Sequence, residues 1–229
     1  SFFTPEGYHV AAKVKEYAVE RSHGHILFGS SQLLPDDDSV GVTVYAPGVF
    51  GAQMYAGNPN FCRLLPVIRD SLHRLRSPGQ RVWVWLDSSW RLLGTPTAFV
   101  MGIQVAEWWY RLPNRLLCVQ ARTFAAPSSA TLECRVVEGE PLPWRITHQL
   151  AVDAQEMDHG ITLEIMPEHA RVCVIPDPLT LVAQRHPGRD FLLTAGPAEN
   201  FHGWSTDERV WLDGCSRQGP YVVAEWSAA

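Results

Sequence analysis

Hydrophobic and polar residues alternate along residues 81–87, directly after a turn signal at Pro78 and Gly79. The alternation places Trp83 and Trp85 on one face of a strand and aliphatic residues on the other. Because both faces carry large apolar groups, the pattern predicts a central strand rather than an edge strand.

Two further β-rich runs follow, at 99–110 and 116–123, and short turns separate them from the run at 81–87. Strands joined by short turns favour a meander. We therefore predict that these three runs form neighbouring strands of one sheet.

The rest of the chain keeps the same character. Residues 40–45 predict a strand and residues 23–28 a short strand or turn, and turn residues recur at short intervals beyond residue 130. The later predicted strands are 131–137, 144–152, 161–166, 171–175, 179–183, 190–195, 209–212 and 221–226. This spacing is typical of a mainly β fold, an antiparallel sandwich or barrel.

One or two short helices complete the prediction. Residues 66–76 begin with a proline, carry an apolar stripe at helical spacing and end before Pro78. Thr4 and Pro5 resemble a helix start, although the residues that follow also fit a strand. We expect two β-rich parts, 1–124 with its core module around 78–122, and 125–229, which can belong to the same domain.

Composition narrows the function classes. The chain has 229 residues and a net charge of −5, which argues against a nucleic-acid surface. No apolar run has the length of a membrane span, and the chain does not open on a signal-peptide pattern. Five cysteines lie far apart, which argues against a disulfide framework and a zinc site. We expect Cys118, Cys134 and Cys173 to be buried free thiols in a reducing compartment.

Candidate chemistry is sparse. His23 and His25 fall on one face of a strand and form a possible metal pair, but the sequence supplies no nearby third ligand. The carboxylates at 36–38 fit a solvated turn better than a cation site. A carboxylate pair in a barrel lumen is conceivable, but solvent-facing strand positions explain the candidates more simply; these are Glu107, Glu133, Asp153 and Glu164. We therefore predict no catalytic residue, no cofactor site and no metal site.

Aromatic residues are the other feature, with nine tryptophans in the chain. Tryptophan, tyrosine and arginine are enriched at the centres of protein interfaces. We expect an interaction surface from two neighbouring groups; they comprise Arg81, Trp83, Trp85, Trp108, Trp109 and Tyr110. Burial in the chain's own core is the alternative, and a ligand platform that also includes Trp90 is a third possibility.

Residues 78–87, 92–94 and 116–122 together resemble a β module of tailed-phage tail-tip and baseplate-hub proteins. In that module a Pro-Gly-initiated strand with Val and Trp leads to a Gly turn and returns as a strand ending in Arg. Residues 187–196 are similar to a closing strand in one such family. The resemblance implies a virion component.

A second set of segments resembles the association domain of interferon regulatory factors, a β-sandwich that binds proteins. Its segments fall in the same order along the chain: 42–45, 66–76, 82–85 and 161–167. The resemblance implies a protein-interaction module, without the family's glycine-tryptophan signature.

These observations predict a non-enzymatic structural or assembly protein. We expect its partners to be other copies of itself or neighbouring structural proteins, with no nucleic acid and no membrane. The expected location is the virion if the phage resemblance holds, and otherwise a reducing cytoplasm. The alternative is a β-barrel enzyme or small-ligand binder built around His23, His25 or the tryptophans.

Overall fold

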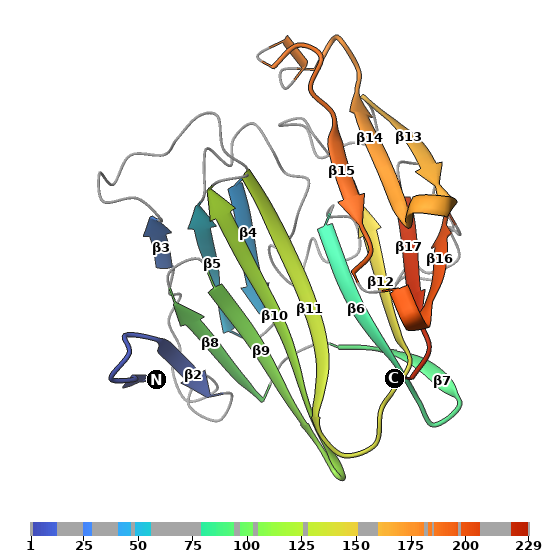
Figure 1. Ribbon diagram of the computed structural model, residues 1–229. Helices are drawn as coiled ribbons and strands as arrows, with labels where there is room; N and C mark the ends of the chain where they lie inside the picture. The colour runs from blue at the N-terminus through green and yellow to red at the C-terminus, as the bar shows by residue number, and fades with distance from the viewer. Residues whose placement is uncertain are drawn as a thin grey trace. The chain divides into compact units, whose positions relative to one another are not determined.

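The described part of the chain folds mainly into β-sheets with mostly antiparallel pairing (Figure 1), which confirms the mainly β fold class. The computed structural model describes residues 2–12, 25–28, 41–46, 49–55, 79–93, 97–102, 105–125, 128–150, 160–180, 183–184, 186–196, 198–206 and 221–228. The predicted helix at 66–76 and the predicted strand at 209–212 lie outside these residues. In the described part, helical structure is confined to two single 3₁₀ turns, η1 (Pro167–His169) and η2 (Ala198–Asn200), and to residues 183–184.

The chain divides into two compact units with interleaved segments. Unit 1 comprises residues 1–59, 65–74 and 93–140, and unit 2 comprises residues 60–64, 75–92 and 141–229. The domain division at residue 125 stays a prediction. In the structure, Ala125 and Ser128 face each other across one hairpin.

Unit 1 contains a six-stranded antiparallel sheet. Its strands, in spatial order, are β1 (Phe2–Phe3), β2 (His9–Ala12), β8 (Ala98–Gly102), β9 (Val105–Leu112), β10 (Arg115–Ala125) and β11 (Ser128–Glu138). One face carries the fully buried Ala106 and Leu117 together with Val119 and Trp108. The small and aliphatic side chains at these alternating positions form the core of the unit.

A second, three-stranded sheet of unit 1 has the order β3 (His25–Phe28), β5 (Val49–Tyr55) and β4 (Gly41–Ala46). Strands β3 and β5 run parallel, and β4 and β5 antiparallel. The strands predicted at 23–28 and 40–45 are thus found within a residue or two, whereas β5 was not predicted.

Unit 2 is built on a five-stranded antiparallel sheet. Its order is β16 (Phe201–Ser205), β17 (Tyr221–Trp226), β12 (Trp144–Gln149), β6 (Gly79–Leu86) and β7 (Ser89–Leu92). Strand β6 lies between β12 and β7, as its two-sided apolar pattern predicted. Both faces of β6 are buried at the middle of the strand, where Val84 and Trp83 lie.

A three-stranded sheet completes unit 2, with the order β13 (Ile161–Met166), β14 (Arg171–Pro176) and β15 (Phe191–Thr194). Val172 and Val174 are fully buried on one face. The predicted strands at 161–166 and 171–175 are confirmed, and the strand predicted at 190–195 is confirmed at its centre.

The predicted meander is wrong in its first member. Strands β8, β9 and β10 are antiparallel neighbours, but β6 belongs to a different sheet and pairs with β12, so that Arg81 lies opposite Thr147. The single run predicted at 99–110 is a hairpin of two strands, β8 and β9. Local alternation identifies a strand but contains no information about a partner more than sixty residues away.

Two smaller expectations also change. The strand alternative holds at the N-terminus, because His9–Ala12 form β2 instead of a helix. Of the strand predicted at 179–183, the described residues Leu179 and Thr180 lie in a turn and Ala183 is helical. The Asp177 carboxylate accepts from the amide of Leu179 at 2.8 Å, and the Thr180 hydroxyl donates to the Asp177 carbonyl at 2.7 Å. An Asx turn of this kind competes locally with strand pairing.

Candidate functional site

Four side chains on one face of the five-stranded sheet form a continuous cluster: Trp85 on β6, Trp90 on β7, Arg145 on β12 and Glu225 on β17. We call this set the tryptophan–arginine cluster. The pairing register fixes it, because Trp85 lies opposite Trp90, and Arg145 lies opposite Glu225. Residues directly opposite each other on antiparallel strands project to the same face.

The four side chains form a chain of contacts from Glu225 through Arg145 and Trp90 to Trp85. The Arg145 Nε and Nη2 atoms each lie 2.5 Å from Glu225 Oε1, as a hydrogen bond and an ion pair. The Arg145 guanidinium carbon lies 4.2 Å from the centroid of the Trp90 ring, a cation–π distance. Trp90 in turn meets Trp85 edge to face, with ring centroids 5.5 Å apart and planes at 75°.

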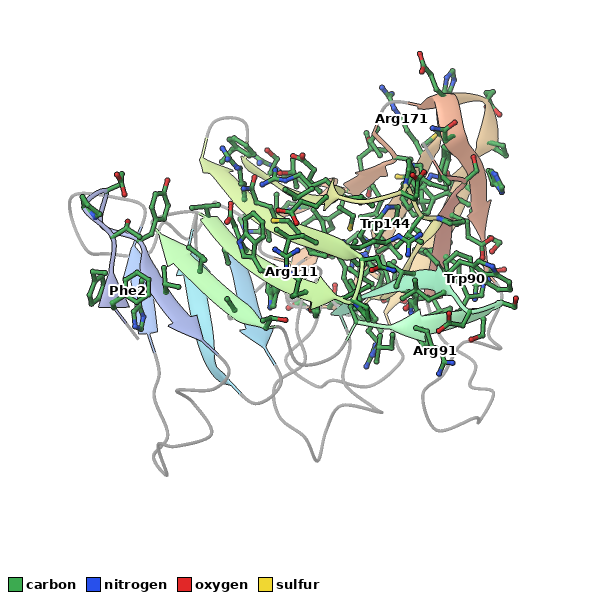
Figure 2. All side chains as sticks on the ribbon, turned by 90° about the horizontal axis from the view of Figure 1, so that it is seen from below. Phe2, Trp90, Arg91, Arg111, Trp144 and Arg171 are labelled. Carbon is green, nitrogen blue, oxygen red and sulfur yellow. The ribbon has the colours of Figure 1, made fainter. Side chains whose placement is uncertain are left out.

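The members of the cluster differ in exposure. Trp85 is 40% exposed, whereas the side chains of Arg145 and Glu225 are 18% and 34% exposed. Trp90 is half-buried on β7, where it and Arg91 project to opposite sides of the strand (Figure 2). The cluster therefore consists of a supported base and one exposed indole.

The turn between β6 and β7 sets the position of the two indoles. Asp87 and Ser88 both adopt positive φ, at 50° and 59°. A two-residue turn with two left-handed residues matches the twist of a hairpin, although glycine or asparagine is preferred there. The Ser89 hydroxyl donates to the Leu86 carbonyl at 3.3 Å across this turn.

Further back along β6, the side chains on the same face as Trp85 are buried. The Trp83 indole N–H donates to the Thr147 hydroxyl at 3.1 Å, and both residues are buried. Arg81, two residues further back along the strand, is 4% exposed. Trp83 and Arg81 therefore support the sheet and present no surface within this chain.

A second polar group lies on the six-stranded sheet, on the face opposite the core of unit 1. Glu107 accepts hydrogen bonds at both carboxylate oxygens: from the Gln120 amide at 2.5 Å and from the Trp109 indole at 2.8 Å. The Arg122 Nε donates to the side-chain oxygen Oε1 of Gln120 at 2.5 Å. We call this set, Glu107, Trp109, Gln120 and Arg122, the glutamate network. Its carboxylate is fully engaged by its neighbours.

The three described cysteines are free thiols, as expected, but only Cys118 is fully buried, whereas Cys134 and Cys173 are half-buried. Burial raises the pKa of the Cys118 thiol to about 11, and burial also raises the pKa of Cys134. Burial raises the pKa of Cys173 as well, with smaller contributions from Asp190 and Glu164. A thiol with a raised pKa is a poor nucleophile at neutral pH, so none of the three has the character of a catalytic cysteine.

The six residues proposed as an interface separate into two groups. Arg81, Trp83 and Trp108 are buried, and burial also raises the pKa of the half-buried Tyr110. Trp85 is exposed, and Trp109 is half-buried in the glutamate network. Adjacent Trp108 and Trp109 face opposite sides of β9, as their alternation predicted. Contact with a second copy or another protein remains a prediction for this set.

The proposed metal pair lies largely outside the described residues. His23 is not among them, and His25 is placed only as the first residue of β3. Across the residues that the structure describes, no group of three metal-ligating side chains comes together. Nor does the described part include a helix with the length and apolar character needed to cross a membrane.

The remaining carboxylate candidates have ordinary surroundings. Glu133 lies 3.5 Å from Arg135 on an exposed part of β11, and Glu164 is exposed on β13. Asp153 is not among the described residues. The solvent-facing explanation therefore fits Glu133 and Glu164, whereas Glu107 is engaged within the glutamate network.

Sequence reasoning missed Arg145 and Glu225. Trp83, Trp85 and Trp90 had been grouped from their proximity in the chain, but Arg145 and Glu225 lie 60 and 140 residues beyond Trp85 in the sequence. The available signal was the match in strand pattern between residues 144–149 and 221–226, both predicted as strands. Nothing local shows that β12 pairs with β6 or that β17 pairs with β12.

Comparison with known proteins identifies the family. A family model described as a glycoside phosphorylase supersandwich domain matches residues 1–222. A curated relative, the 1,2-beta-oligoglucan phosphorylase of Listeria innocua serovar 6a, is 32% identical over 165 residues. That alignment covers 72% of this chain and 15% of the relative, so the chain spans only a small part of the relative's length.

These findings overturn the sequence-based resemblances. The match over residues 1–222 contradicts the phage tail-tip prediction, together with the virion location and the assembly role drawn from it, and neither resemblance anticipated the family found. The short Pro-Gly, Val-Trp and Gly-turn pattern is common to many β-hairpins, because turn chemistry and alternation recur wherever strands pair. The ligand-binder alternative fits the comparisons better. The chain belongs to the glycoside phosphorylase supersandwich domain family.

Proposed function

We propose that this chain forms part of an enzyme that phosphorolyses a β-linked oligoglucan. The observation that carries the proposal is the family match over residues 1–222, supported by the similarity to an oligoglucan phosphorylase. In phosphorolysis the glycosidic C–O bond breaks, an oxygen of inorganic phosphate bonds to the anomeric carbon, and the departing sugar oxygen takes up a proton.

Within this proposal, the described residues serve to bind and frame the saccharide rather than to transfer protons. The half-buried Glu107 accepts one hydrogen bond at each oxygen, from Trp109 and Gln120, which fits a structural role in the sheet. The three described thiols are held in their neutral form, because burial raises each pKa. Catalytic groups are then supplied by other residues of the enzyme.

We further propose that the enzyme works in a reducing compartment. Cys118, Cys134 and Cys173 are all free, and the first is fully buried. Free cysteines in a β-rich protein fit a reducing environment better than an oxidising one. A mass measurement of the protein purified without reductant, before and after alkylation under denaturing conditions, tests this.

The activity test uses the full-length gene product that contains this chain. Purified protein is incubated with β-1,2-linked oligoglucan and inorganic phosphate, and released glucose 1-phosphate is measured. We expect release that depends on phosphate and on the oligoglucan. Oligoglucans with β-1,3 and β-1,4 linkages test the substrate class. Absence of phosphate-dependent release from all three substrates contradicts the proposed function.

A further inference from the structure

We propose that the tryptophan–arginine cluster is a binding site for a segment of a β-linked glucan chain, with Trp85 as its stacking surface. This inference rests on the proposed function, whose substrate class it takes over, and it assigns a site to particular residues.

The first argument is exposure. Of the eight tryptophans that the structure describes, Trp85 alone falls in the exposed class, at 40%. A large aromatic surface left in water is unfavourable, at roughly 25 cal/mol for each Å² of apolar area. The half-buried Trp90 lies beside it, with ring centroids 5.5 Å apart, so the exposed indole is part of a two-ring aromatic surface that a ligand can cover.

The second argument is rigidity. Glu225 fixes Arg145, Arg145 stacks on Trp90, and Trp90 supports Trp85 from its edge. The Asp87–Ser88 turn closes the hairpin directly beside the two indoles. A surface that is held before the ligand arrives loses little conformational freedom on binding, which favours affinity.

The third argument is chemical. A β-linked glucose ring presents C–H groups on its faces and hydroxyl groups around its edge. The C–H groups suit the electron-rich face of an indole. The neighbouring guanidinium offers donors and the neighbouring carboxylate offers acceptors, the pair of groups that hydroxyls need.

The same groups argue against a protein partner. Arg145 and Glu225 are 18% and 34% exposed at their side chains. A protein surface covering Trp85 with apolar side chains removes water from this ion pair, and glutamate is depleted at the centres of such interfaces. Sugar hydroxyls replace that water with hydrogen bonds.

The test uses the full-length protein and a β-1,2-linked oligoglucan, without phosphate, so that binding is measured apart from turnover. Isothermal titration is applied to the wild type, Trp85→Ala and Trp85→Phe. We expect Trp85→Ala to weaken binding of long chains about tenfold, which corresponds to about 1.4 kcal/mol. Trp85→Phe keeps an aromatic face and retains most of the affinity.

Phe124→Ala is the matched control, because Phe124 is an equally exposed aromatic, at 43%, on the sheet of unit 1. We expect it to bind the glucan as the wild type does. Circular dichroism and the unfolding midpoint establish that each variant is folded, and the proportion bound at saturation is compared only for folded variants. If Trp85→Ala does not fold, the comparison of Trp85→Phe with Trp85→Gln replaces it, with the larger loss expected for Gln.

Two outcomes overturn the inference. The first is phosphorolysis with unchanged glucan affinity in every folded Trp85 variant, which leaves the proposed function intact and removes this site. The second is a change in native mass with no change in glucan affinity, which assigns Trp85 to a protein interface. If the wild type has no phosphorolytic activity, the proposed function is contradicted. The comparison of glucan affinity between the wild type and the Trp85 variants still tests the site.

Discussion

Glu107 on the six-stranded sheet and Glu225 on the five-stranded sheet are both half-buried carboxylates near a tryptophan and an arginine, but their surroundings differ. In the glutamate network, Gln120 and Trp109 occupy the two oxygens of Glu107, and every contact stays within the sheet. In the tryptophan–arginine cluster, both contacts from Arg145 go to one oxygen of Glu225, and the chain of contacts ends at the exposed Trp85.

The difference separates a structural network from a surface built for a ligand. Polar groups that satisfy one another within the sheet stabilise it and leave nothing for a ligand to complete. A supported aromatic ring that remains in water keeps a face on which a ligand can stack. Residue type alone does not distinguish the two, because both contain tryptophan, arginine and glutamate.

The largest expected effect is on stability in the glutamate network. Glu107→Ala removes the acceptor of the buried Gln120 amide and of the Trp109 indole, and we expect a loss of about 3 kcal/mol in the free energy of unfolding. Denaturant titration measures it. Glu138→Ala is the control, because its ion pair with Arg111 at 2.6 Å is more than half exposed and contributes less than about 1 kcal/mol. Equal losses in the two variants contradict the distinction between network and surface pair.

A second prediction concerns pH and Cys118, which lies on β10 on the same face as Gln120. Burial raises the pKa of its thiol from 9.0 to about 11, so the folded state keeps the proton over a range in which the unfolded state loses it. The neutral thiol contributes about 2 kcal/mol to the free energy of unfolding below pH 9, and this contribution is lost as the pH rises toward 11. The stability of the wild type relative to Cys118→Ala, measured by thermal unfolding, therefore decreases across that window.

Cys134 lies on the opposite face of the same sheet, and burial raises its pKa as well. The double variant Cys118→Ala/Cys134→Ala should therefore lose more of the pH dependence than either single variant. A wild-type advantage that stays constant between pH 8 and pH 11 contradicts the prediction.

The sequence predicted the strands of these regions far better than their partners. Alternation identified β6 and its two buried faces, because strand periodicity is local. It also placed Trp108 and Trp109 on opposite faces. Pairing of β6 with β12, and of β12 with β17, joins residues 60 to 82 positions apart in the sequence. The contact of Arg145 with Glu225 and Trp90 was therefore not predictable from local pattern.

The same limit applies to the exposure of the tryptophans. The exposed Trp85 and the buried Trp83 lie two residues apart on one face of β6, and the sequence pattern does not distinguish them. The difference in exposure coincides with the end of the sheet, where β12 begins at Trp144 and leaves Trp85 beyond its paired residues.

A third prediction tests the tryptophan–arginine cluster at its centre. Arg145→Ala removes the ion pair with Glu225 and the stacking on Trp90, and we expect a loss of about 2 kcal/mol in stability together with weaker glucan binding. Arg145→Lys restores only part of both, because an ammonium cannot reproduce a flat guanidinium stacked on a ring. Titration calorimetry and denaturant unfolding measure the two quantities. Full recovery of both with lysine contradicts the stacking role.

The smallest expected effect is a gain. Ser88 adopts a φ of 59°, a conformation that costs an ordinary residue about 1 kcal/mol and glycine little. Ser88→Gly makes the turn Asp-Gly, a favoured pair for a two-residue hairpin, and should raise the unfolding free energy by up to about 1 kcal/mol.

Ser205→Gly is the control, because Ser205 is exposed at the end of β16 and outside the left-handed region. The added freedom of the unfolded chain should lower the stability of this variant by about 0.5 kcal/mol. A stabilised Ser88→Gly variant with unchanged glucan affinity means that the hairpin only holds Trp85 in place, whereas a stabilised variant with altered affinity means that the strained turn itself adjusts how the indole is presented.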